Sequence, residues 1–232
     1  SPDDNAFAPA ADVLGEIEQC VRKFRDRFRL PVRTVRNHRT FWTGYADLPR
    51  LWERLGVEMD ANYVSCGFGG RNFDKYYSQP AAALPMSFLD EGGRLIRVLQ
   101  QPVTSSDDAD FSPVGGATNK GRSFSPEVFE SYGRALLART LEPLGLPFAF
   151  VFHPGNFCTF ANGAETRFLR AAAEAGAALL SDYDWLDFWQ MRRSWRLTAV
   201  SSEGSHARFR YAGDAARGLA VSMPATWAGR TA

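Results

Sequence analysis

The sequence predicts an α/β protein built from parallel βα units. Segments with helical periodicity alternate with short apolar segments typical of buried strands, in the order helix, strand, helix, strand, a long intervening region, helix, strand, helix, strand, helix. Four of these strands end in polar or titratable residues, and ligands of α/β proteins bind at the carboxyl ends of strands. We therefore expect a functional site at that edge of the sheet.

The composition is that of an ordinary globular protein. The 232 residues are 45% hydrophobic and 23% charged, which suits one sizeable core with a small appendage. The formal charge of +1 offers no large field for nucleic acid or an anionic membrane surface, so we expect neither as a partner. The three cysteines, Cys20, Cys66 and Cys158, are too far apart for a disulfide framework or a C-x-x-C metal motif.

The length of the apolar segments and the N-terminal sequence indicate where in the cell the protein is expected. No stretch approaches the roughly 18 apolar residues that span a bilayer, and the start, SPDDNAFAPA, lacks the regions of a signal peptide. We expect a cytoplasmic protein, although a signal peptide removed earlier would leave no trace. Because the sequence begins with Ser1 rather than Met, we also expect a processed or excised piece of something longer.

The first βα units are predicted close to the N-terminus. Apolar residues recur at spacings of three and four from Val13 to Phe28, which predicts an amphipathic helix. A short strand at Val32–Val35 and a helix over YADLPRLWERLG follow, and Gly56 supplies the helix stop. The next strand, VEMDANYV, comes directly after it.

Residues 66–124 are predicted to be a long excursion from the core, because they are rich in Gly, Ser, Asp and Pro. Excursions of this length are commonly functional. Within them, LPMSFLDEGGRLIRVLQQP indicates two strands joined at Glu91-Gly92-Gly93, which is a hairpin signal.

The second half returns to βα alternation. A serine cap at Ser125 begins a helix, and the strand PFAFVFHP follows it. The helix AETRFLRAAAEAG ends at Gly176, a short strand is predicted in AALLS, and DWLDFWQMRRSW is the last helix. Residues 196–232 alternate in the manner of antiparallel strands, so we divide the chain into a main domain, 1–195, and a small β appendage, 196–232.

Four strand ends carry the candidate site residues, which are Arg36-Asn37-His38-Arg39, Asp60-Ala61-Asn62-Tyr63, His153-Pro154-Gly155-Asn156 and Ser181-Asp182. His153 follows an apolar strand, and its near-neutral pKa suits a general acid, a general base or a metal ligand. The alternative is a histidine held by backbone groups in a tight turn. Asp60 could orient a histidine or an arginine, or simply begin a turn through Asn62.

The cluster after the first strand is basic. Arg36 is a candidate fixed donor to a catalytic carboxylate or a carbohydrate oxygen. His38 lies between arginines that would depress its pKa and keep it a neutral acceptor. The alternative is a positively charged loop that caps a neighbouring helix end. The three histidines of the chain cannot be assigned to a metal site by spacing alone.

Three segments, VRTVRNHRTFWTGYADLPRLWERLGVEMDANY, LPMSFLDEGGRLIRVLQQP and FVFHPGNF, resemble the later part of polysaccharide deacetylase-like proteins, the family related to chitooligosaccharide deacetylases. The resemblance covers roughly Val13 to Trp195. It implies a distorted (β/α) barrel that removes N- or O-acetyl groups from sugars. It also implies a divalent metal, commonly zinc, held by one aspartate and two histidines.

The resemblance also implies roles for individual residues. Arg36 resembles the arginine that orients the catalytic base, His153 is similar to the general acid for the leaving group, and Asp60 occupies the place of the acid that tunes this histidine. In such a mechanism metal-bound water attacks the acetyl carbonyl and an imidazolium protonates the departing amine or alkoxide. Expected contacts to the acetylated carbohydrate are His38, Arg39, Trp42, Tyr63 and Asn156.

The family's first two motifs have no counterpart in this sequence. These motifs are paired aspartates after an apolar strand and a histidine pair four residues apart, so the expected barrel lacks its N-terminal strands and its metal ligands. We expect the C-terminal part of a metal-dependent carbohydrate deacetylase whose partner is the missing N-terminal part of the barrel. The main alternative is a degenerate barrel that binds glycans through Trp42, Tyr45, Tyr63 and Trp189 without chemistry. A more distant alternative is an enzyme that uses His153 and Asp60 as a metal-free acid/base pair.

Overall fold

The computed structural model describes residues 10–37, 41–63, 84–103, 105–106, 126–141, 147–152, 163–203, 206–213, 226–227 and 230–231. The chain divides into two compact units, Ser1–Leu179 and Leu180–Ala232, and each is described by itself. This division precedes the last helix, whereas the sequence placed the domain boundary after it, at residue 195. Within the described ranges no helix has the length and apolar character needed to cross a membrane.

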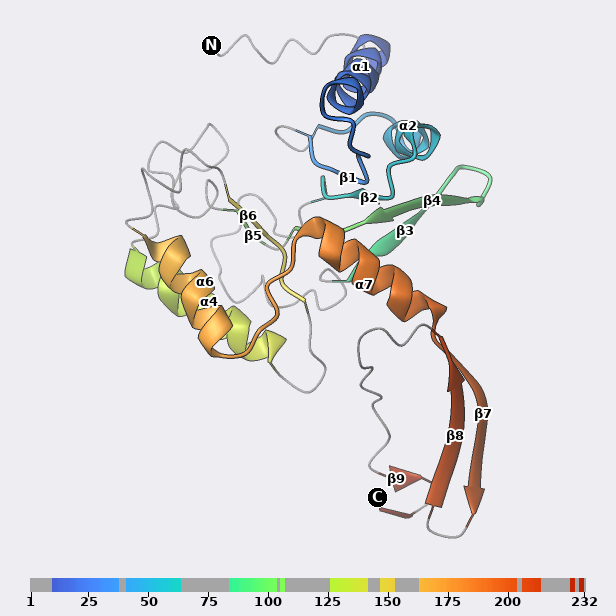
Figure 1. The fold of residues 1–232 in the computed structure, drawn as a ribbon, viewed down its shortest axis with the longest axis vertical. Coiled ribbons are helices and arrows are strands. Elements are labelled where there is room, and N and C mark those ends of the chain that lie inside the picture. Colours follow the sequence, from blue (N-terminus) through green and yellow to red (C-terminus); the bar gives the residue numbers. More distant parts are fainter. Residues whose placement is uncertain are drawn as a thin grey trace. The chain divides into compact units, whose positions relative to one another are not determined.

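The first unit is a mixed α/β structure (Figure 1). Its elements are α1 (Ala10–Phe28), β1 (Thr34–Val35), α2 (Asp47–Leu55), β2 (Met59–Asp60), β3 (Met86–Leu89), β4 (Leu95–Gln100), β5 (Ser105–Ser106), α4 (Pro126–Thr140), β6 (Phe150–Val151) and α6 (Ala164–Glu174). Four strands form a sheet in the order β1-β2-β4-β3, in which β1, β2 and β4 are parallel and β3 is antiparallel. The described strands form open sheets and none closes into a barrel.

Helices α1 and α2 cover one face of this sheet (Figure 1). Helix α2 buries one stripe at helical spacing, and the stripe packs against Ile96 and Val98 of β4. The buried positions of α2 are Leu48, Leu51, Trp52 and Leu55. Gly56 ends the helix in the left-handed region at φ 68°, as its predicted role as a stop requires.

The hairpin predicted around Glu91 is confirmed, and one of its strands also joins the parallel part of the sheet. Strand β3 pairs antiparallel with β4, and β4 also pairs in parallel with β2. β4 is therefore an interior strand of the sheet. The sequence analysis predicted both strands of this hairpin within the span 66–124, and the structure adds that Ile96 and Val98 of β4 are 1% exposed.

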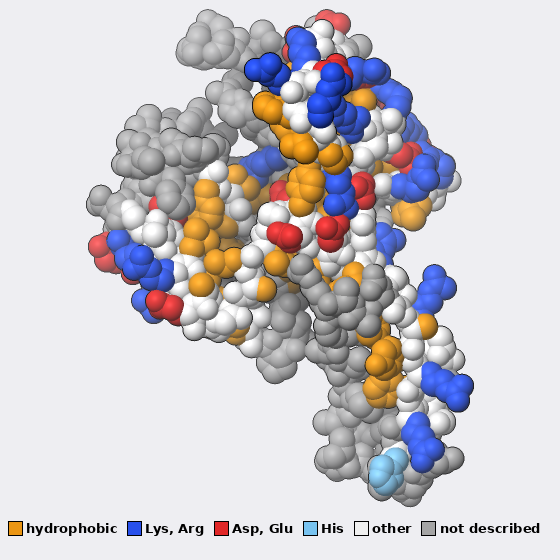
Figure 2. Space-filling model, in the orientation of Figure 1, with side chains coloured by type: hydrophobic (Ala, Val, Ile, Leu, Met, Phe, Trp, Pro, Cys, Tyr) orange, Lys and Arg blue, Asp and Glu red, His pale blue; other side chains and the backbone are white. Residues whose placement is uncertain are grey.

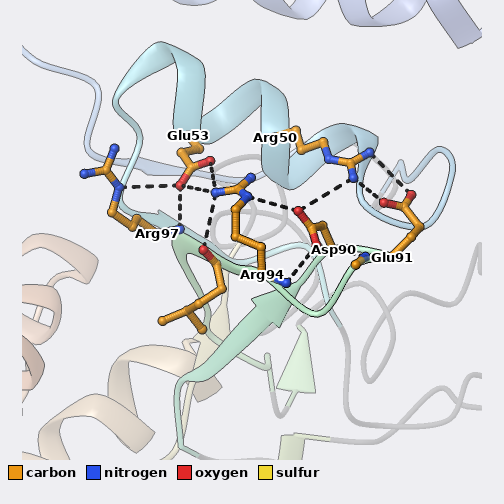
Figure 3. Close-up of polar contacts among 8 residues, drawn as sticks. Arg50, Glu53, Asp90, Glu91, Arg94 and Arg97 are labelled. Atoms are coloured by element: carbon orange, nitrogen blue, oxygen red, sulfur yellow. Dashed lines mark hydrogen bonds and ion pairs between the residues drawn. The ribbon is translucent and has the colours of Figure 1, made fainter.

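A network of charged groups joins α2 to this hairpin (Figure 3). Glu53 accepts hydrogen bonds from the Arg97 backbone N–H at 2.9 Å and from Arg94 Nη1 at 3.1 Å. Arg94 also donates to Asp90 at 3.0 Å, and Arg50 pairs with Glu91. The Arg97 N–H and Arg94 hold the pKa of Glu53 below its ordinary value.

Helices α4 and α6 pack against each other in the same unit (Figure 1). Gly133 permits their close approach, because a Cβ at this position would lie 2.5 Å from the Phe168 ring. An ion pair between Glu130 and Arg167 also joins the two helices. Strand β6 pairs in parallel with β5, so part of the predicted strand PFAFVFHP is confirmed.

The predicted short strand AALLS, residues 177–181, is not present. These residues have no regular structure, and Leu179 is 54% exposed. The apolar run instead connects Gly176, which follows α6, to Ser181, the N-cap of the next helix, whose Oγ accepts from the Asp184 N–H at 3.2 Å. The strand end predicted at Ser181-Asp182 is therefore a helix start.

The second unit contains one helix and antiparallel strands. Its elements are α7 (Asp182–Ser194), β7 (Arg196–Glu203), β8 (His206–Ala212), β9 (Thr226–Trp227) and β10 (Arg230–Thr231). The pairs β7–β8 and β9–β10 are both antiparallel, as the tail's alternation predicts. Trp195 stacks on Tyr211 at the base of the β7–β8 ribbon, with ring centroids 4.9 Å apart.

Replacing Glu53 with glutamine should destabilise the fold in a pH-dependent way. A lowered folded-state pKa means that ionised Glu53 stabilises the fold above its unfolded-state pKa, about 4.3, and that this stabilisation is lost as the pH falls through the folded-state pKa. Urea midpoints of the wild type and Glu53→Gln should differ most near about pH 7 and converge toward about pH 3.

Glu91→Gln is the matched control for this comparison, because Glu91 is 55% exposed and pairs with Arg50 at the surface. Its midpoint should change less than that of Glu53→Gln at each pH. A Glu53→Gln difference that does not depend on pH would contradict a role for the charge.

Candidate functional site

The carboxyl ends of three parallel strands align in register. Val35 of β1 pairs with Asp60 of β2, and Asp60 pairs with Gln100 of β4. The residues that end or follow these strands are polar, and we call this set the polar edge. It consists of Arg36, Asp60, Asn62, Gln100 and Gln101.

Asp60 is the centre of the polar edge and is fully buried. Its carboxylate accepts three hydrogen bonds, from Trp52 Nε1 at 2.6 Å, from the Asn62 backbone N–H at 2.7 Å and from Asn62 Nδ2 at 2.9 Å. The bond to the N–H two residues ahead turns the chain where β2 ends. This geometry matches the alternative that the sequence left open, an acid that begins a turn through Asn62.

Burial and hydrogen bonding act on the Asp60 carboxyl in opposite directions. Burial raises its pKa, because removal from water penalises the charged form, whereas the bonds from Asn62 and Trp52 lower it. Burial is the larger effect, and the pKa of Asp60 lies above its ordinary value. All three groups that contact the carboxyl are N–H donors. An ionised carboxylate matches them best, because both of its oxygens only accept hydrogen bonds.

Asn62 also ties the first strand to the second. The Asn37 backbone N–H, two residues beyond β1, donates to Asn62 Oδ1 at 2.6 Å. Asn37 Nδ2 donates to the Phe41 carbonyl at 3.2 Å and so orders the chain beyond the strand. Arg36 lies half-buried between Val35 and Asn37, at the level of this bond. The ends of β1 and β2 are therefore held together by side chains.

Two glutamines that sequence reasoning missed complete the polar edge. Gln100 and Gln101 are each 2% exposed, and the Gln101 backbone N–H donates to the Asp60 carbonyl at 2.8 Å. Gln101 Nε2 donates to the Pro102 carbonyl at 2.9 Å, while Gln100 Oε1 is buried and accepts no hydrogen bond from the described residues. The signal available was a polar pair directly after the apolar run LIRVL, in a segment assigned to the excursion.

The other candidate residues fall into two groups. His38, Arg39, His153 and Asn156 lie outside the described residues. Trp42 and Tyr63 follow the ends of β1 and β2, and their side chains are 37% and 54% exposed. Trp42 stacks on Phe88 with centroids 5.7 Å apart and donates from Nε1 to the Gly44 carbonyl at 3.1 Å.

Trp189, proposed as one of the glycan-binding aromatics, is a buried residue. Only 8% of it is exposed, and Trp185 packs beside it with ring centroids 5.8 Å apart. Trp189 therefore packs within the second unit and presents little ring surface to a sugar. Tyr45, in contrast, is 65% exposed.

The described part of the chain offers no cluster of metal ligands. It holds no group of three or more His, Cys, Asp or Glu side chains that could bind a metal ion. No family model, curated protein or solved structure matches the chain.

Replacing Trp52 with phenylalanine should destabilise the protein by about 1–3 kcal/mol, because it leaves a buried carboxylate oxygen with one donor fewer. The pKa of Asp60 should rise further, since one of the bonds that lowers it is lost. Denaturant unfolding followed by circular dichroism measures the change. Trp42→Phe is the matched control and should cost less, because Trp42 donates at the surface; equal losses would contradict the special role of Asp60.

Proposed function

We propose that the polar edge supports the carbohydrate site of a polysaccharide deacetylase-like hydrolase that removes N- or O-acetyl groups. One observation carries the proposal. Arg36 and Asp60, the two described residues that resemble the family's catalytic residues, lie at the ends of adjacent parallel strands at one edge of the sheet. In an α/β protein this edge is where ligands bind. On this proposal the strands form part of a distorted (β/α) barrel.

The proposal assigns each residue a distinct task. Arg36 presents a planar donor to a catalytic carboxylate or to a carbohydrate oxygen. His153 transfers a proton to the leaving amine or alkoxide. Asp60 is a positioning residue that fixes the end of β2 and biases the charge of His153, and its own orientation is set by Trp52 and Asn62.

The resemblance implies a divalent metal, commonly zinc, and the described residues do not fit one. They contain no group of three or more potential metal-binding side chains, and the oxygens of Asp60 already accept three N–H groups. The family's ligand set, one aspartate and two histidines, would have to come from other residues. No step of the proposal is therefore assigned to a metal bound by the described residues.

Acetate release from an acetylated chitooligosaccharide by the full-length protein tests the proposal. Arg36→Ala and His153→Ala should each reduce turnover by about 100-fold or more, the scale expected for a lost acid or orienting group. Arg33→Ala is the matched control, because Arg33 precedes β1 and pairs with Glu58. Near-wild-type turnover in either Arg36→Ala or His153→Ala would contradict the proposed hydrolase function.

A second function, glycan binding without hydrolysis, is favoured by the exposed aromatics that follow the same strand ends. Trp42 and Tyr63 each present a ring at the surface, and sugar rings stack on such faces. Trp42→Ala and Tyr63→Ala should each weaken binding of the chitooligosaccharide by about tenfold, as expected for about 1.4 kcal/mol. Calorimetry measures the affinity, and Phe28→Ala, which removes a 57% exposed ring on α1, is the control.

The two functions give different results with the same ligand. Binding that depends on Trp42 and Tyr63 but releases no acetate would support the glycan-binding function alone. Affinities that are equal in the wild type and all three aromatic variants would exclude a role for these rings.

A further inference from the structure

Helix α1 separates its charges by sign along its length. Residues 10–21 hold three acidic residues and no basic one, whereas residues 22–28 hold four basic residues and one acidic residue. This order complements the helix dipole, which favours acids near the N-terminus and bases near the C-terminus. The dipole does not determine which face of the helix carries the charges, and that face follows from how α1 packs.

One side of α1 contacts α2 and the core. Val21 is 7% exposed within the core, Glu18 accepts a hydrogen bond from Arg54 of α2 at 2.8 Å, and Arg25 donates to the Leu55 carbonyl. Positions 18, 21 and 25 are three and four residues apart, so they share one side of the helix. This side is therefore occupied by the protein's own fold.

A further set of small and apolar residues lies roughly a third of a turn away from that side. We call Val13, Cys20 and Phe24 the outer stripe. Val13 is half-buried, Cys20 is exposed and Phe24 is 42% exposed. Their spacings of seven and four residues are typical of helices that pair with one another. Figure 2 shows hydrophobic side chains at the surface beside Lys and Arg side chains around α1.

Exposed charges of both signs flank the outer stripe along one side. Glu16 and Lys23 are two helical turns apart, and Arg27 follows Lys23 by one turn. Glu16 forms no hydrogen bond or ion pair with a described residue, and Lys23 donates to Gln19 at 2.9 Å. Lys23 and Arg27 are like charges four residues apart, a spacing at which they repel along the helix. An acidic group beside Lys23 from another helix would relieve this repulsion.

A second copy of α1 provides that acidic group when the two helices run antiparallel. If Cys20 lies opposite Cys20 of the partner, Glu16 of each helix is within about one residue of the level of Lys23 of the other. Phe24 then lies between the levels of Val13 and Ile17 of the partner. A parallel pair would instead place Glu16 beside Glu16 and Lys23 beside Lys23. The charge order of α1 is therefore complementary to itself in the antiparallel direction alone.

We propose that the outer stripe of α1 binds the same stripe of a second copy in a two-fold symmetric dimer. Cys20 lies at the two-fold axis, and the ion pairs between Glu16 and Lys23 set the direction of the helices. An anionic lipid surface fits this face less well, because it would repel Glu16 at the edge of the stripe. The dimer does not depend on the proposed hydrolase function.

Sedimentation equilibrium of the full-length protein over a range of concentrations tests the dimer. Glu16→Lys and Lys23→Glu should each weaken dimerisation at least tenfold, because each places like charges side by side. An equimolar mixture of the two variants should recover the dimer, since each then supplies the charge that the other lacks. Asp26→Lys is the matched control. It makes the same change of charge as Glu16→Lys at an exposed position away from the outer stripe, and it should change the affinity less than threefold.

Cross-linking with a short bismaleimide locates the interface. Mass spectrometry should find the Cys20 peptide linked to itself in the wild type and in Asp26→Lys, and not in Glu16→Lys. Circular dichroism establishes that each variant folds, and Phe24→Ala, which removes apolar contact from the stripe, replaces a charge variant that does not. A monomer at every concentration, a mixture that does not recover the dimer, or a dimer cross-linked only through other cysteines would each overturn the proposal. Acetate release is not part of these measurements, so either proposal can fail without the other.

Discussion

The hydrogen bond between Trp52 and Asp60 joins the apolar core to the polar edge of the first unit. Trp52 is 1% exposed and belongs to the core formed by α2 and β4, while Asp60 ends the strand β2. An ionised carboxylate in such a place is costly unless donors surround it. Trp52 supplies one donor and Asn62 supplies two, which makes a buried acid compatible with the fold.

The need for donors around the Asp60 carboxylate constrains the backbone as well as the side chains. Asn62 can reach Asp60 only if the chain turns immediately after β2, and the same Asn62 accepts the Asn37 N–H beyond β1. The Asp60 carbonyl accepts the Gln101 N–H beyond β4. The ends of three parallel strands are thus held by one residue and its turn, and the segments that follow these strands start from defined positions.

Sequence patterns recovered the elements that carry their own local signals. Helix α2 has a buried stripe and a glycine stop, and the β3–β4 hairpin has turn residues between two apolar segments. The patterns failed where a short apolar run had no such signal. Residues 177–181 are as apolar as a strand, but they connect two helices, because Ser181 caps α7 and the preceding leucines remain exposed.

The candidate site was predictable only in part, for a related reason. Arg36 and Asp60 could be found because each directly follows an apolar segment, and strand ends are where ligands bind. Trp52, Gln100 and Gln101 could not, because their roles depend on pairing between distant segments. The sequence of α2 does not indicate that the indole of Trp52 donates to Asp60. The sequence RVLQQP likewise does not indicate that β4 pairs with β2.

The pairing of Met59 with Leu99 has a consequence for how the chain folds. These residues are 40 positions apart, so the sheet cannot be completed until a long loop has closed, whereas α2 and the β3–β4 hairpin need only local contacts. Non-local pairing of this kind slows folding, because the entropy of closure is lost before the contacts form. The same relation makes the connection tolerant of length, since doubling it costs only about 0.6 kcal/mol. Insertions between β2 and β3 are therefore a route by which this fold can vary without losing its sheet.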